Sequence, residues 1–139
     1  MLPELLVKPL VAAALAEDLG RRGDITTEAT IPAEKHGTVA LVAREAGVVA
    51  GLQCAVLAWE LVAESAPGGQ PVAVAVAKPD GAAVRPGETI ATISGPVRAL
   101  LTGERVALNF LGHLSGVATA TAQIAQAIAH TKSKVADTR

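Results

Sequence analysis

A chain of 139 residues is long enough for one domain with its own core. Half of its residues are hydrophobic and its mean hydropathy is +0.41, which excludes a disordered protein. The net charge is -1, the 12 Lys and Arg residues are spread along the chain, and the aromatic residues are one Trp and one Phe. This balance excludes a nucleic-acid partner and an anionic membrane surface, because both require a basic footprint.

The chain also lacks the signals of export and of membrane insertion. The N-terminal residues MLPELLVKPL place an acid and a proline where a signal peptide needs a basic start, and no run of 18 uninterrupted apolar residues occurs. We therefore expect a cytoplasmic protein. Cys54 is the only cysteine and lies in an apolar segment without a basic neighbour, so we interpret it as an inert buried thiol rather than a nucleophile.

The first predicted element is a helix with Pro9 in its first turn. Leu10, Val11, Ala14 and Leu15 follow at helical spacing, and Gly20 is suited to the stop. A polar turn comes next, in which Asp24 or Thr26 could cap a short helix that ends before Pro32. On local grounds this turn is a capped surface loop rather than a phosphate site.

Short β-rich segments alternate with a helix through the middle of the chain. Strands are predicted at 37–50, with a turn or bulge at Gly47, at 71–77 and at 89–93; a helix is predicted at 52–64, and a turn at Asp80–Gly81. Helices interleaved with short strands and tight turns are typical of an α+β domain with an antiparallel sheet or sandwich.

The pattern becomes helical from Val97 to about residue 129. This stretch is too long for one ordinary helix, so we expect a bend at Gly112 or Gly116. The last six residues, 134–139, resemble a short strand that ends polar. We accordingly place an N-terminal α+β domain at 1–111, and a linking helix with one further strand at 112–139.

A polar stripe follows one face of the long helical segment. Its members are spaced by three, four, three and four, with His113 beside them: Thr102, Arg105, Asn109, Gly112 and Gly116. An apolar face forms the expected buried side: Leu100, Ala107, Leu111, Leu114 and Ala118. The stripe indicates either helix packing satisfied by hydrogen bonds of Asn109 and His113, or contact with another backbone, a subunit or an anion.

Other candidate sites are weak when taken from the residues alone. Thr138 and Arg139 follow a β pattern and would suit an anionic substrate at a strand end, but a solvated chain end explains them equally well. The three histidines are far apart, without Cys or carboxylates at ligand spacing, so no metal site is predicted. Neither a Gly-rich phosphate loop nor a catalytic triad can be assembled, so the catalytic residues stay unknown.

Four blocks together resemble the quinolinate phosphoribosyltransferases. The blocks, in family order, are Glu17-Asp18-Leu19-Gly20 with Gly23-Asp24-Ile25-Thr26-Thr27, then 44–52 (REAGVVAGL), 103–119 (GERVALNFLGHLSGVAT) and 136–139 (ADTR). Each block is modest alone, but together they cover nearly the whole chain. The last block looks like the start of a basic substrate-binding motif.

The resemblance implies phosphoribosyl transfer from 5-phosphoribosyl 1-pyrophosphate to quinolinate, with decarboxylation to nicotinate mononucleotide for NAD synthesis. It implies an N-terminal α+β domain followed by the first strand of a truncated α/β barrel, and a homodimer or higher homo-oligomer. In the family pattern Arg105 binds substrate from the partner subunit, and Arg139, with Thr138 beside it, binds substrate in the barrel. Magnesium is the implied cofactor, with ligands beyond residue 139, so the fragment alone is expected to be inactive.

Two other functions remain open at this point. A pyrophosphorylase-like protein associated with molybdate transport genes would share the fold, with an uncertain substrate. A carrier domain is the alternative from another class, because residues 80–90 (DGAAVRPGETI) resemble half of a biotinyl- or lipoyl-type hammerhead. A carrier needs a lysine at an exposed hairpin tip, and Lys78 before the Asp80–Gly81 turn lacks the usual flanking pattern.

Overall fold

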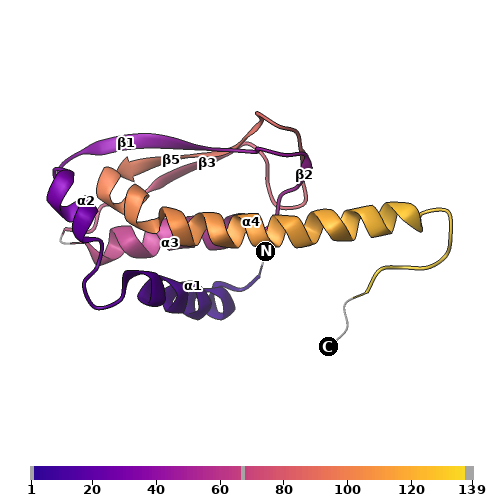
Figure 1. The fold of residues 1–139 in the computed structure, drawn as a ribbon, viewed down its shortest axis with the longest axis horizontal. Coiled ribbons are helices and arrows are strands. Elements are labelled where there is room, and N and C mark those ends of the chain that lie inside the picture. Colours follow the sequence, from indigo (N-terminus) through magenta and orange to yellow (C-terminus); the bar gives the residue numbers. More distant parts are fainter. Residues whose placement is uncertain (1, 67, 137–139) are drawn as a thin grey trace.

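The computed structural model describes residues 2–66 and 68–136 as an α+β fold. The elements follow in the order α1 (Glu4–Leu19), α2 (Ile25–Thr30), β1 (His36–Val42), β2 (Gly47–Val48), α3 (Leu52–Ser65), β3 (Ala73–Val76), β4 (Ala83–Val84), β5 (Thr89–Pro96) and α4 (Val97–Ala127). A sheet lies on α3 and α4, and α1 lies on the opposite side of these helices (Figure 1). The predicted fold class, an antiparallel sheet with packed helices, is confirmed.

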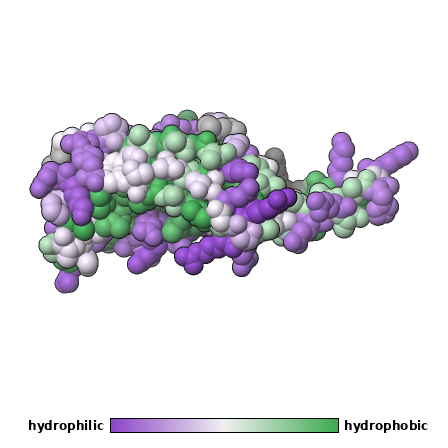
Figure 2. Space-filling model, turned by 90° about the horizontal axis from the view of Figure 1, so that it is seen from above, coloured by the Kyte–Doolittle hydropathy of each residue, from purple (hydrophilic) through white to green (hydrophobic). Residues whose placement is uncertain are grey.

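The main sheet has three strands in the order β1-β5-β3, and both outer strands run antiparallel to β5. Leu41, Ala91 and Ile93 point toward the helices and are buried. The opposite face carries small residues, among them Thr38 and Ser94, whose hydroxyls are 2.8 Å apart. In Figure 2 this face is pale or green over the sheet, between hydrophilic ends. A second sheet pairs β2 with β4. The sequence analysis did not predict β4.

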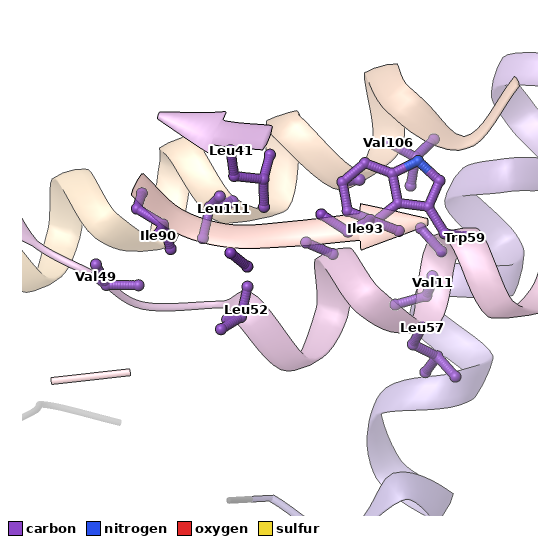
Figure 3. Packing of buried hydrophobic residues seen from close by; sticks show 14 of the residues in the cluster. Val11, Leu41, Val49, Leu52, Leu57, Trp59, Ile90, Ile93, Val106 and Leu111 are labelled. Carbon is purple, nitrogen blue, oxygen red and sulfur yellow. The ribbon is translucent and has the colours of Figure 1, made fainter. Parts of the chain in front are cut away.

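The core forms where α3, α4, α1 and β5 meet. Trp59 of α3 is 1 % exposed, and its indole lies beside Val106 of α4 and Ile93 of β5 (Figure 3). The indole Nε1 donates a hydrogen bond of 2.9 Å to the carbonyl of Leu100. Gly103 allows this approach, since a Cβ there would lie 2.8 Å from Cδ1 of Trp59. Gly103 is therefore the glycine through which α4 packs closely against α3, and the sequence analysis did not single it out.

Helix α1 begins five residues before the predicted proline position. Pro9 lies inside the helix rather than in its first turn, so the predicted start was wrong. A proline at this position cannot donate to the carbonyl of Leu5, a loss of helix stability. Burial of Val7 on one side of the proline and Val11 on the other offsets that loss, because both residues anchor α1 to the core. The predicted stop at Gly20 is confirmed, with φ at 54° and its N–H bonded to Ala16.

Helix α4 runs through 31 residues without interruption, so the predicted bend at Gly112 or Gly116 was wrong. Both glycines are exposed, and a Cβ at either would meet no atom within 4 Å, so no packing contact forces a bend. The Ala-rich continuation favours helix and carries it on. The predicted boundary between residues 111 and 112 falls within this helix and stays a prediction.

The end of α4 projects past the sheet (Figure 1). Its contact with the rest of the domain is made by Ser115 and Thr119, whose hydroxyls accept hydrogen bonds from the backbone of Ala50 at 3.0 Å and of Val48 at 2.9 Å. Residues 134–136 have no strand conformation, contrary to the prediction, because no described strand lies beside them to complete a ladder. The remainder of that predicted strand, 137–139, lies outside the described residues.

Candidate functional site

The polar stripe predicted on α4 lies on the surface of the domain. Arg105, Asn109 and His113 are all exposed, whereas Thr102 is half-buried. Asn109 and His113 form no side-chain hydrogen bond within residues 2–66 and 68–136, so the helix-packing interpretation of the stripe is not supported. The apolar side is confirmed for Leu100, Ala107 and Leu111, which are buried, while Leu114 and Ala118 are half-buried.

Arg105 is paired with an acid from another helix. Its Nη1 donates a 3.0 Å hydrogen bond to Oδ1 of Asp18 in the last turn of α1. The Arg105 side chain is 75 % exposed and the Asp18 side chain is 17 % exposed. Sequence reasoning missed Asp18 as a partner, although it lies in the first of the quoted blocks. The two residues are 87 positions apart, so no local pattern could have paired them.

A second acid, Asp24, holds the start of α2 against α4. Its Oδ1 accepts from the backbone N–H of Thr27 and its Oδ2 accepts from the hydroxyl of Thr102, both at 3.0 Å. The predicted choice between two caps is thereby resolved in favour of Asp24. Hydrogen bonds from the side chain and backbone of Thr27 lower the pKa of Asp24, with smaller contributions from Thr102 and from the charge of Arg105, against an opposing effect of burial.

We expect Asp24→Ala to lower the free energy of unfolding by about 1 kcal/mol at neutral pH, the usual loss for an N-cap. Because the folded pKa is below the ordinary 3.8, this contribution is complete above pH 3.8 and is lost as the pH falls through the folded value. Urea unfolding of the wild type and the variant at pH 7 and at pH 2.5 measures the difference. Asp24→Asn is the control, since it keeps the cap acceptor but cannot titrate. If the difference in the free energy of unfolding between the wild type and Asp24→Ala were the same at both pH values, the lowered pKa of Asp24 in the folded state would be contradicted.

Beside the Asp18–Arg105 pair, a groove of about 560 Å³ runs between α1 and α4. Its walls are mainly apolar and include Phe110 and Leu114, with Asn109 and His113 at the polar side. Cys54 also lines it and is half-buried. Burial, with a smaller contribution from Asp80, raises the pKa of the Cys54 thiol, as expected for an inert cysteine, although the residue is half-buried rather than buried as predicted.

The other sequence candidates are not brought to Arg105 by the described structure. Thr138 and Arg139 lie outside the described residues. Within the part of the chain that is described, no three His, Cys, Asp or Glu side chains are grouped to hold a metal ion. Lys78, the carrier candidate, is not at a hairpin tip: it follows β3 and pairs with Glu88 at 3.4 Å, which disfavours a modification site. Across 2–66 and 68–136, no helix is both long and apolar enough to cross a bilayer.

Comparison with known proteins gives one consistent result. Residues 24–115 match the model of the quinolinate phosphoribosyl transferase N-terminal domain. The carboxylating nicotinate-nucleotide pyrophosphorylase of Mycobacterium leprae is 40 % identical over 93 % of this chain and 44 % of its own length, and a probable one from Synechocystis is 39 % identical over 99 % and 44 %. The chain thus spans less than half the length of these curated relatives.

Solved structures agree with the sequence relatives. The crystal structure of NadC from Streptococcus pyogenes matches with a TM-score of 0.90 and 37 % identity, over all of this chain and 47 % of that one. The nicotinate-nucleotide pyrophosphorylase from Francisella tularensis matches with a TM-score of 0.86 and 30 % identity over the same shares. A family model that covers residues 24–115, together with an equivalent fold, shows that this chain belongs to the quinolinate phosphoribosyltransferase family, whose N-terminal domain it contains.

Proposed function

We propose that this chain is the N-terminal part of an enzyme that transfers phosphoribose from 5-phosphoribosyl 1-pyrophosphate to quinolinate, releases carbon dioxide and pyrophosphate, and yields nicotinate mononucleotide for NAD synthesis. Family membership and the names of the relatives support this activity. The role of the domain is to supply Arg105 to the substrate site. Release of labelled carbon dioxide from quinolinate by the full-length protein, dependent on 5-phosphoribosyl 1-pyrophosphate, is the direct test. Its absence would favour the molybdate-associated alternative.

The exposed guanidinium of Arg105 is the observation that carries the proposal. Quinolinate is a dicarboxylate, and a guanidinium binds a carboxylate through two parallel hydrogen bonds. Arg105 projects from α4 on a stripe that otherwise holds a hydroxyl, an amide, an imidazole and glycines, with 75 % of its side chain exposed. A simple solvated face would carry several lysines and glutamates, so this composition favours a site completed by another part of the protein.

The remaining parts of the site belong to the proposal as well. Thr138 and Arg139 would bind substrate at the end of the first barrel strand, by their match to the family motif. Magnesium would neutralise the pyrophosphate. By the family resemblance, its ligands would lie beyond residue 139. We propose a cytoplasmic location for the enzyme.

We further propose that the enzyme is a homodimer or higher homo-oligomer in which Arg105 enters the partner's site. Support comes from the apolar surface beside Arg105. The exposed leucines Leu6 and Leu10 of α1 lie four positions apart, with Leu2 another four positions earlier, just before the helix, and they lie on a different face from the buried Val7 and Val11. Such a stripe on an outer helix is typical of an interface. A twofold interface of this kind would bring both Arg105 side chains to opposite subunits.

A complementation experiment tests the trans arrangement. When Arg105→Ala and Arg139→Ala subunits are co-expressed with different tags, the heterodimer has one site with both lesions and one with neither. Tandem-purified heterodimer should therefore recover about half of the wild-type activity, because one of its two sites is intact. Doubly tagged wild-type dimer and the two parent homodimers are the controls. Heterodimer activity no higher than that of the parents would show that Arg105 serves the site of its own subunit.

A further inference from the structure

The ion pair between Asp18 and Arg105 joins two of the sequence blocks that identify the family. Asp18 lies in the Glu17-Asp18-Leu19-Gly20 block and Arg105 in the block 103–119. The proposed reaction gives a role to Arg105 but none to the acidic block. Their contact, a single 3.0 Å hydrogen bond from Nη1 to Oδ1, supplies a reason for that block.

Asp18 is the fixed member of the pair. It lies in the last turn of α1, where Leu15 is buried and the chain turns at Gly20, whose N–H closes the helix on Ala16. Its side chain is only 17 % exposed, against 75 % for that of Arg105. A long exposed arginine loses little by changing rotamer, and exposed ion pairs contribute little to stability. The pair therefore determines the direction of the guanidinium more than it stabilises the domain.

The pair also leaves most of the guanidinium unoccupied. A guanidinium has five N–H donors in a planar fork, and in the described residues only Nη1 of Arg105 has a hydrogen-bond partner. Asp24, a second acid close enough for the charge of Arg105 to act on it, already accepts from Thr27 with one oxygen and from Thr102 with the other. One acid thus holds the arginine while the second is engaged elsewhere, and the Nε and Nη2 groups remain for a ligand.

We propose that Asp18 is a positioning residue for Arg105: it holds the guanidinium through Nη1, so that the remaining donors are presented to a carboxylate of the substrate. This inference rests on the proposed function of Arg105. Because both residues belong to the same chain, the pair enters a partner's site as one preassembled unit.

Kinetics of Asp18 variants in the full-length enzyme test this role. Asp18→Ala should raise KM for quinolinate roughly tenfold, a part of the loss expected for Arg105→Ala, with kcat changed by less than about twofold. KM for 5-phosphoribosyl 1-pyrophosphate should stay unchanged. Asp18→Asn keeps an acceptor oxygen in the same position and should restore most of the affinity. The matched control is Glu4→Ala, which breaks a 3.7 Å ion pair to Lys8 on the same helix.

Two further measurements separate positioning from a structural role. The melting temperature of Asp18→Ala should fall by no more than about 4 °C, as for an exposed ion pair. The double variant Asp18→Ala/Arg105→Ala should be no worse than Arg105→Ala alone, because two residues that act as a unit are not additive. Asp18→Asn serves the same comparison if the alanine variant fails to fold.

The outcomes are distinguishable. If Arg105→Ala is impaired while Asp18→Ala and Asp18→Asn behave like Glu4→Ala, the positioning role is overturned and the function of Arg105 stands. Losses that add in the double variant also overturn it, since Asp18 would then act independently of Arg105. If Arg105→Ala itself keeps normal kinetics, both the proposed function of Arg105 and the role of Asp18 fall. The proposal is supported if Asp18→Ala raises KM for quinolinate alone, if Asp18→Asn restores most of the affinity, and if Asp18→Ala has no further effect in the Arg105→Ala background.

Discussion

Replacement of Arg105 by alanine in the full-length enzyme is expected to lower kcat/KM for quinolinate by about ten- to a few hundredfold. A hydrogen bond between charged groups contributes about 1.5–3 kcal/mol, and the variant loses this interaction with a substrate carboxylate. Stability should change little, because the side chain is mostly exposed and its one described contact is the pair with Asp18. Steady-state kinetics with quinolinate as the varied substrate, together with a thermal melt, give both quantities.

Two variants sharpen this experiment. Arg105→Lys keeps the charge but loses the planar fork, so it should recover only part of the activity. Lys35→Ala removes an exposed positive charge between α2 and β1 and should leave the kinetics unchanged. If Arg105→Ala lost several kcal/mol of stability while its kinetics stayed intact, the stripe on α4 would be structural and the proposed site would be wrong.

Replacement of Trp59 by alanine is expected to lower the free energy of unfolding of the domain by about 3–5 kcal/mol, as for other buried Trp or Phe residues truncated in a core. The indole is 1 % exposed and lies against α4 at Gly103 and Val106, and its Nε1 bonds to Leu100. Truncation opens a cavity between α3 and α4, and neither helix can close it without moving the sheet. Urea unfolding followed by circular dichroism measures the loss, since the variant has no Trp for fluorescence.

Trp59→Phe provides the matched control for the core. It keeps an aromatic ring in the same place but loses the N–H donor and part of the volume, so a loss of about 1–2 kcal/mol is expected. A Trp59→Ala variant as stable as Trp59→Phe would mean that the α3–α4 contact is not the centre of the core. The two sets of variants thus test separate properties: Arg105→Ala is expected to weaken substrate binding without a loss of stability, and Trp59→Ala to lower stability without a change at the proposed site.

The sequence by itself determined the elements that depend on local signals. The stop of α1 at Gly20 follows from the freedom of glycine at positive φ. For α2 the sequence predicted a cap at Asp24 or Thr26, and the hydrogen bond that Asp24 accepts from the N–H of Thr27 decided between them. Helix α3 and the strand β5 follow from hydrophobic periodicity, and the exposed stripe through Arg105 from helical spacing. The family resemblance came from motif order alone and is confirmed.

Only the tertiary structure decided the features that depend on distant partners. Pro9 lies inside α1 because burial of Val7 and Val11 offsets the lost hydrogen bond, and α4 stays continuous because nothing packs on Gly112 or Gly116. The pairing of Asp18 with Arg105 joins residues 87 positions apart, and residues 134–136 form no strand where no neighbour pairs with them. Helix spacing and caps are encoded within a few residues of the chain. Whether a helix tolerates a proline, which strand pairs with which, and where an arginine side chain points all depend on residues that only folding brings together.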